Sequence, residues 1–416
     1  MGAGLIQRGK SQLTKSNEYF LSVDDSKAIK PLFENIWPAN LSTFSVVLEK
    51  TNDQNTAALC IEGFAHSIKI CGYFNMKDER DAFVASLSKF ASVSSDQRIK
   101  NKNILVIRQI LELATYQGNY LGESWFFVLE CISRLEEMIQ VGHGNILDSD
   151  FFETNSNQPT NKKMSQASRA MHEQNRQANC ELVVQSIEMS QIDQIFQSSL
   201  NLDQDAIIQF IENLCKVSRQ ELVDAVNPRK FSLQALVEVA DLNMARIRFV
   251  WTRIWQMLSE HFVHVGSHEN LNVAIFAIDS LRQLADKFLI KDEFASFNFQ
   301  KDFLKPFEQI MLHNLATRTD IKEYIVMCIT NICRTKTAFI KSGWSVIINI
   351  FTLAAQDSEE MLVSQSFYAL KIAITEKFSL LEHNFVELVN CLNKYSMNSQ
   401  FPKQAGEAQR LLLVCS

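Results

Sequence analysis

Apolar positions along the chain recur with the period of an α-helix. Between Val273 and Leu289 they follow i, i+3, i+4, i+7 spacing on two stripes. The first stripe comprises Val273, Phe276, Ala277, Ser280, Leu281, Leu284 and Phe288, and the second comprises Ile275, Ile278, Ala285 and Leu289. A helix with two apolar stripes must be covered on two sides, as in a stacked helical array.

Helices of this kind are predicted in pairs. First helices are expected to start near Asn55, Asn101, Asn270, Asp320 and Ser358, roughly every 40 to 50 residues where they are adjacent. Second helices are expected at 78–93, 123–140, 299–315, 342–355 and 382–394. Two of these second helices open alike, with a glycine and a tryptophan close together: Gly122 and Trp125 in one, Gly343 and Trp344 in the other. The pattern predicts an all-α, HEAT/armadillo-like superhelical solenoid of stacked helix pairs.

Capping signals suggest where some helices begin. Asp320 is predicted to cap a helix at its N-terminus, with Glu323 three residues later as a variant capping box. Ser218 and Glu221 have the spacing of a standard capping box, which predicts a second helix start there.

Composition shifts divide the chain into blocks. We expect a loose N-terminal segment at 1–17, a first helical block at 18–142 and a second at 179–416. Residues 143–178 are rich in Asn, Ser and Gln and are predicted to form a polar flexible connector. The final residues are apolar and lack a helix cap, which predicts a solenoid truncated at its C-terminus.

Composition narrows the class of protein. A chain of 416 residues exceeds a single core of about 250–300 residues, and its 12 Gly and 6 Pro favour long helices. The net charge of −6 argues against a nucleic-acid binder and implies no broad basic membrane-binding face. Nine cysteines without a CxxC pair are expected to be free thiols in a reducing compartment. With no secretory signal and no spanning segment, a cytoplasmic protein is expected, with any membrane contact peripheral.

Three histidines form the one candidate metal cluster. His264 and His268 are four residues apart, a spacing that can bind a metal on one helix. Gly266 lies between them and is predicted to end the helix, which would place His261 and His264 in its last turn. We favour the helix-end interpretation and expect no metal site.

A basic set close to two tryptophans is the candidate partner-binding site. It comprises Arg246, Arg248 and Arg253 beside Trp251 and Trp255, and Lys291, Lys301 and Lys305 follow the next helix. Arginine and tryptophan are enriched at binding hot spots. In the alternative interpretation, which we favour, both tryptophans are core residues and the arginines extend to solvent.

Catalytic signatures are missing from the sequence. It contains no P-loop, no GxGxxG after a strand and no GxSxG elbow, so no catalytic residue and no cofactor is predicted. An enzyme whose site is assembled from distant residues stays as one alternative.

Several ordered motifs resemble the large Arf guanine-nucleotide exchange factors of the brefeldin A-inhibited (BIG) class. The resemblance covers most of the chain and is densest around 227–311. The motifs include Cys60-Ile61-Glu62-Gly63, Gly118-Asn119-Tyr120-Leu121-Gly122, Asp279-Ser280-Leu281-Arg282-Gln283-Leu284 and Phe299-Gln300-Lys301-Asp302-Phe303-Leu304-Lys305-Pro306-Phe307. The similar part of that family lies downstream of its catalytic exchange domain and is called HDS.

The resemblance implies a non-catalytic regulatory scaffold in Golgi vesicle traffic. The implied partners are an Arf-type or Rab-type small GTPase, the protein's own catalytic domain and the trans-Golgi membrane surface. The segment Ala405-Gly406-Glu407-Ala408-Gln409-Arg410 looks like the one that carries the family's catalytic glutamate, but no exchange domain surrounds it. Glu407 is therefore expected to be a solvated residue near the start of the last helix. The alternative is a generic HEAT-type adaptor unrelated to nucleotide exchange.

Overall fold

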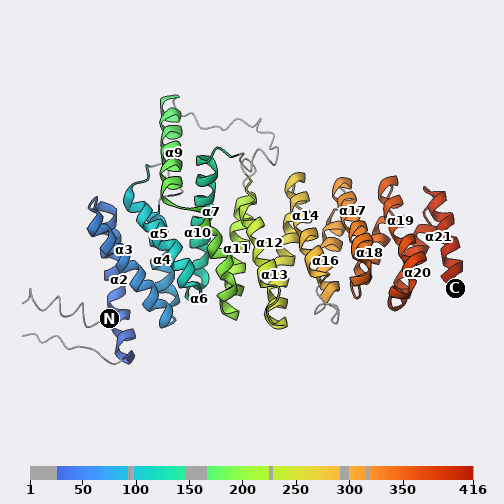
Figure 1. The fold of residues 1–416 in the computed structure, drawn as a ribbon, viewed down its shortest axis with the longest axis horizontal. Helices are drawn as coiled ribbons and strands as arrows, with labels where there is room; N and C mark the ends of the chain where they lie inside the picture. The colour runs from blue at the N-terminus through green and yellow to red at the C-terminus, as the bar shows by residue number, and fades with distance from the viewer. Residues whose placement is uncertain are drawn as a thin grey trace, which may run out of the picture. The chain divides into compact units, whose positions relative to one another are not determined.

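The computed structural model describes residues 26–91, 93, 98–145, 166–223, 228–290, 299–314 and 318–415. Every regular element within these ranges is an α-helix or a short 3-10 helix, and none is a strand (Figure 1). The prediction of an all-α array of stacked helices is confirmed. Its assignment to the HEAT or armadillo repeat type stays a prediction.

The described residues divide into two compact units. Unit 1 draws on Met1–Leu135 and Ala167–Glu188, and unit 2 on Glu136–Gln166 and Met189–Ser416. The predicted connector 143–178 is helical from Gln166, where α9 begins. The predicted loose segment 1–17 and the centre of the connector, 146–165, lie outside the described residues.

Unit 1 is built around α3, which packs against α2, α4 and α5. Its core contains Phe64 and Phe83, whose ring centroids lie 6.0 Å apart in an edge-on arrangement. α7 begins in this unit and ends in unit 2. The elements are α2 (Ser26–Lys50), α3 (Gln54–Tyr73), α4 (Lys77–Phe90), α5 (Asn101–Tyr116), α6 (Gly118–Leu121), η1 (Gly122–Ser124), α7 (Trp125–Gly142) and α9 (Gln166–Ser186).

Unit 2 is a two-layer array in which helices of each layer pack on the next helix of the same layer, except that the last helix of the chain packs mainly on the helix before it. Layer A comprises α11 (Gln204–Val223), α13 (Arg248–Gly266), α16 (Phe299–His313), α18 (Trp344–Ala354) and α20 (Phe385–Ser396). Layer B comprises α10 (Met189–Ser198), α12 (Phe231–Asn243), α14 (Leu271–Phe288), α17 (Thr319–Lys336), α19 (Glu360–Lys377) and α21 (Pro402–Cys415). Short 3-10 helices lie at Ser199–Asn201 (η2), Thr337–Phe339 (η3), Phe378–Leu380 (η4) and Glu382–Asn384 (η5). In Figure 1 the pairs succeed one another in chain order.

An aromatic cluster joins α13, α14 and α16. Trp255 stacks on Phe303 with centroids 4.1 Å apart, and Phe288 of α14 lies 4.5 Å from Phe303 and 5.0 Å from Trp251. Trp251 and Trp255 are 1% and 3% exposed, so both are core residues, as the favoured interpretation predicts. Large buried aromatic side chains of this kind dominate core energetics.

Polar side chains tie each helix pair to the next at the loops. Arg246 donates to three carbonyls near η2, and Arg318 donates to the carbonyl of His268. Lys322 pairs with Asp357, and Asn398 donates to the carbonyls of Ala355 and Asp357. We call these contacts the loop ties. They satisfy groups that a helix end or a buried loop would otherwise leave unpaired.

Helix starts agree with the predictions to within a few residues, but the two capping boxes do not. α17 already begins at Thr319, so Asp320 lies within the first turn of the helix and does not cap it. The helix dipole still stabilises a carboxylate at this position. Ser218 and Glu221 lie inside α11 and are buried. Ser218 faces His261, and Glu221 accepts from the backbone and side chain of Ser232 at 2.9 and 2.7 Å, so tertiary contacts replace the expected cap.

Candidate partner-binding surfaces

Arg246 is bound within its own chain. Its guanidinium Nη2 donates to the carbonyls of Ser199, Leu200 and Leu202 at 2.9, 3.0 and 2.8 Å. Its Nε donates to Asn243 Oδ1 at 2.6 Å. Burial lowers the pKa of Arg246, and the charge of Asp203 opposes that effect. With its donors used in this way, Arg246 holds η2 and the residue that follows it to the end of α12.

Arg248 and Arg253 are exposed on α13, on the outer side of the buried tryptophans. Arg253 Nη1 lies 3.9 Å from Asp205 Oδ1, and their side chains are 51% and 91% exposed. Such an exposed pair contributes little to stability. These arginines therefore extend to solvent, and their part in partner binding stays a prediction.

Lys301 and Lys305 are exposed on α16, whereas Lys291 lies outside the described residues. The ring of Phe299 lies 6.5 Å from Trp251, which brings the start of α16 beside the start of α13. Arg248 and Lys301 thus lie near the starts of two neighbouring helices, α13 and α16, and Lys305 lies about one turn further along α16. Arg246 is engaged elsewhere.

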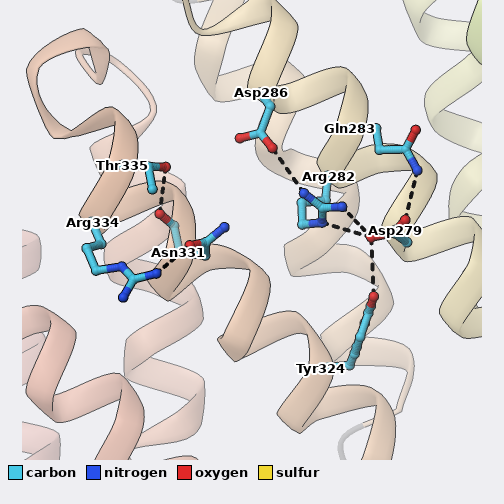
Figure 2. A network of polar contacts seen from close by, with 8 residues as sticks. All are labelled: Asp279, Arg282, Gln283, Asp286, Tyr324, Asn331, Arg334 and Thr335. Carbon is cyan, nitrogen blue, oxygen red and sulfur yellow. Dashed lines mark hydrogen bonds and ion pairs between the residues drawn. The ribbon is translucent and has the colours of Figure 1, made fainter.

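A second polar surface, which the sequence reasoning did not single out as a site, joins α14 to α17 (Figure 2). Arg282 lies between two carboxylates of its own helix: its Nη2 is 2.7 Å from Asp279 Oδ1 and its Nη1 is 3.1 Å from Asp286 Oδ2. Gln283 donates to the other Asp279 oxygen at 2.8 Å, and Tyr324 of α17 donates to Asp279 at 3.3 Å. We call these five residues the α14–α17 network.

Asp279 and Arg282 are held in their charged forms, and Tyr324 is held in its neutral form. Burial tends to raise the pKa of Asp279, but hydrogen bonds from Gln283 and Arg282 and the charge of Arg282 outweigh it, so the pKa is lowered. Burial and the charge of Asp279 raise the pKa of Tyr324 to about 12. Asp279, Arg282 and Asp286 are still 29%, 28% and 31% exposed. A partner could therefore contact side chains whose positions are already fixed, which lowers the entropic cost of binding.

Further paired charges continue along layer B. Lys287 of α14 contacts Asp241 of α12 at 2.5 Å, and Lys371 of α19 contacts Glu407 of α21 at 2.7 Å. At the end of α17, Arg334 donates to Asn331, as Figure 2 also shows. In the sequence, Arg282 follows Asp279 by three residues and precedes Asp286 by four. This spacing is typical of ion pairs on one helix face and could have predicted the network.

The histidines of the candidate metal cluster differ in burial. α13 runs to Gly266, so His264 lies in the last turn as expected. His261 is fully buried, its Nε2 lies 3.1 Å from Ser218 Oγ, and burial lowers its pKa to about 3. The helix-end interpretation is therefore wrong for His261, which is a neutral core residue. Within the described part of the chain, no group of three or more metal-binding side chains occurs.

Glu407 lies in the first half of α21 and is paired with Lys371, which lowers its pKa. Eight cysteines in the described ranges are free and buried, and burial raises the pKa of Cys131, Cys215 and Cys333 to about 12. Buried thiols that stay protonated pack as small apolar groups.

None of the described helices is both long enough and apolar enough to span a bilayer.

Residues 287–372 match the family model described as Mon2/Sec7/BIG1-like HDS. This range contains α16, α17 and α18 and most of α19, and it includes Tyr324 of the α14–α17 network. The chain is also similar to curated proteins over nearly its whole length.

Brefeldin A-inhibited guanine nucleotide-exchange protein 3 of Arabidopsis thaliana is 37% identical over 453 residues, which cover 99% of this chain and 26% of that protein. Protein 2 of the same plant is 35% identical over 433 residues, covering 95% and 24%. Protein 1 of Homo sapiens is 36% identical over 427 residues, covering 95% and 22%. The chain spans about a quarter of the length of these relatives. It therefore belongs to the family of brefeldin A-inhibited guanine nucleotide-exchange proteins, in the part that contains the HDS domain.

Proposed function

We propose that this chain is a non-catalytic regulatory region of a large Arf exchange protein that acts in vesicle traffic at the Golgi. The observation that carries the proposal is the similarity of 95% or more of the chain to proteins named for guanine-nucleotide exchange. Glu407 pairs with Lys371 of the neighbouring helix α19, and we propose that the chain has no exchange activity of its own.

The α14–α17 network is the surface that we assign to the partner. The partner is an Arf-type or Rab-type small GTPase, or the catalytic exchange domain of the same protein. Arg282 and Asp279 offer a fixed donor and a fixed acceptor on neighbouring turns, so a partner with complementary polar groups can bind without ordering them first. The network's flanking pairs, such as Lys287 with Asp241, extend the polar surface.

Regulation follows if the partner distinguishes two states of the exchange protein. A GTPase that binds more tightly to the open state shifts the equilibrium away from the inhibited state by the ratio of the two affinities. A GTPase with equal affinity for both states would change nothing.

The test is a pull-down of the full chain against Arf-type and Rab-type GTPases, each loaded with a GTP analogue or with GDP. We expect one GTP-loaded GTPase to be retained and its GDP form to be released. A separate arm offers the isolated catalytic exchange domain. Failure of every arm, with helical circular dichroism intact, would overturn the proposal and favour a generic adaptor.

Exchange activity is measured in the same samples by the release of a fluorescent GDP analogue from the GTPase. We expect the spontaneous rate with the chain alone. An accelerated rate would contradict the assignment as non-catalytic. We further propose a cytoplasmic location, peripheral at the trans-Golgi membrane.

A further inference from the structure

One edge of unit 2 gathers basic and exposed apolar side chains from separate helices. Contacts between aromatic rings bring these helix ends together: Phe288 at the end of α14 and Phe299 at the start of α16 both lie against Trp251 near the start of α13. Gln300 then reaches the segment before α18, because its Nε2 donates to the carbonyl of Phe339 at 2.9 Å and its Oε1 accepts from Lys341 N at 2.7 Å.

Three large apolar side chains on this edge are exposed to solvent. Ile247 and Phe249 at the start of α13 are 59% and 69% exposed, and Phe339 is 40% exposed. Single exposed apolar side chains are common, but a group of large ones on one edge marks an interaction site.

Exposed basic residues accompany them. Arg248 lies between Ile247 and Phe249, Lys301 lies in the first turn of α16, and Lys341 lies just before α18. We define these three basic and three apolar residues as the basic edge. The first turns of α13 and α18 carry no acidic residue, although acids are favoured there by the helix dipole, whereas the first turn of α16 carries the exposed Asp302 beside Lys301. Because basic residues near a helix start do not stabilise the helix, helix stability does not explain why basic residues occur on this edge.

We infer that the basic edge docks on a bilayer surface rich in anionic phospholipids. The charge is complementary to that surface although the chain as a whole carries −6. The apolar residues sit at the ends of different helices, so a plane can meet them together, whereas a bound peptide helix would need a continuous apolar groove. Phe249 and Ile247 enter the headgroup boundary, and the basic side chains contact the lipid phosphates.

This inference rests on the proposed membrane location but not on the proposed GTPase contact. It names the surface and the lipid chemistry that would hold the region at the membrane. The α14–α17 network is built from other residues, so the two surfaces can be tested separately.

The experiment is vesicle flotation of the full chain with phosphatidylcholine alone or mixed with phosphatidylserine. We expect binding only to the mixed vesicles, weakened by salt. The edge variant Arg248→Gln/Lys301→Gln/Lys341→Gln should bind about 100-fold more weakly, since each basic residue near such a surface contributes a several-fold gain. The apolar variant Phe249→Ser/Phe339→Ser should also bind at least about 10-fold more weakly.

The matched control is Lys77→Gln/Lys394→Gln/Lys403→Gln, which removes the same charge from exposed lysines that are not part of the basic edge. It should lose only a few-fold in binding. Equal losses in the edge and control variants, or no flotation of the correctly folded chain, would overturn the inference. A pull-down of the edge variant with the GTPase should be unchanged, which separates this result from the proposed function.

Discussion

Lys322 of α17 lies 2.6 Å from Asp357, and the two side chains are only 6% and 8% exposed. Asp357 also accepts the backbone N–H groups of Ser358 and Glu359 at 2.8 and 3.2 Å, just before α19 begins. One buried carboxylate thus fixes the start of α19 and links it to the neighbouring helix.

Lys322→Met should lower the free energy of unfolding by about 3–5 kcal/mol, because it leaves the Asp357 carboxylate buried without its cation. Adding Asp357→Asn should recover part of that loss. Lys371→Met serves as the control, since its pair with Glu407 is 44% and 32% exposed and should change stability by no more than about 1 kcal/mol. Urea denaturation followed by tryptophan fluorescence measures all three, and equal effects of the two lysine variants would contradict the prediction.

The stability of the protein should fall as the pH drops below about 6.5, partly through His261. Burial lowers the pKa of His261 to about 3, from an ordinary value of 6.5. Between these values the unfolded chain binds a proton that the folded chain does not, so a falling pH favours unfolding. From pH 7 to pH 5 this residue should cost roughly 2 kcal/mol.

His261→Gln removes the titrating group and keeps a polar atom that can reach Ser218. Its urea midpoint should change less between pH 7 and pH 5 than that of the unaltered protein. The lowered pKa of His264 should contribute equally in both proteins. Identical pH profiles would show that His261 is not neutral in the folded state.

Gly122→Ala should destabilise unit 1 by about 2–4 kcal/mol. Gly122 has a φ of +51°, and an added Cβ would lie 2.7 Å from the Arg80 guanidinium, which donates to the carbonyl of Tyr120. Gly343→Ala is the control, because Gly343 has an ordinary helical φ of −61° and its Cβ would meet Leu304 at 3.0 Å. Thermal unfolding compares the two, and a smaller loss for Gly122→Ala would contradict the argument.

Arg282→Gln should weaken binding of the GTP-loaded GTPase about 10- to 100-fold if the α14–α17 network is the docking surface, because it removes a fixed cation from the interface. Lys371→Gln removes an equal charge from the same layer and should have little effect. Binding is measured by titration calorimetry, with circular dichroism as the check on folding. Equal affinity of Arg282→Gln and the unaltered chain would exclude the network as the docking surface.

The helical periodicity was sufficient to predict the array, because each helix is amphipathic over several turns. Val273, Leu281 and Phe288 of the first stripe are buried in α14, although Phe276 of that stripe is only half-buried, and helix starts near Asn101 and Asn270 agree with the structure. The spacing of apolar residues along a helix depends directly on which face of the helix is buried, so it can be interpreted from the sequence alone.

Capping and site assignments were less predictable because they depend on residues distant in sequence. Ser218 and Glu221 have the spacing of a cap, yet they are buried against His261 and Ser232. Gly122 and Gly343 looked equivalent beside their tryptophans but differ in backbone conformation. The contacts that hold Arg246 within its own chain could not be predicted either, because its carbonyl partners lie 44 to 47 residues away.

The loop ties determine where the chain can be shortened. A protein ending at residue 356 would keep Lys322, whose side chain is only 6% exposed, but lose the carboxylate of Asp357 with which it pairs at 2.6 Å. One ending after Asp357 would keep that pair but lose Asn398, which caps the carbonyls of Ala355 and Asp357. Deletion variants should therefore lose solubility in steps, one for each helix pair that is removed together with its loop ties, rather than in proportion to the length removed.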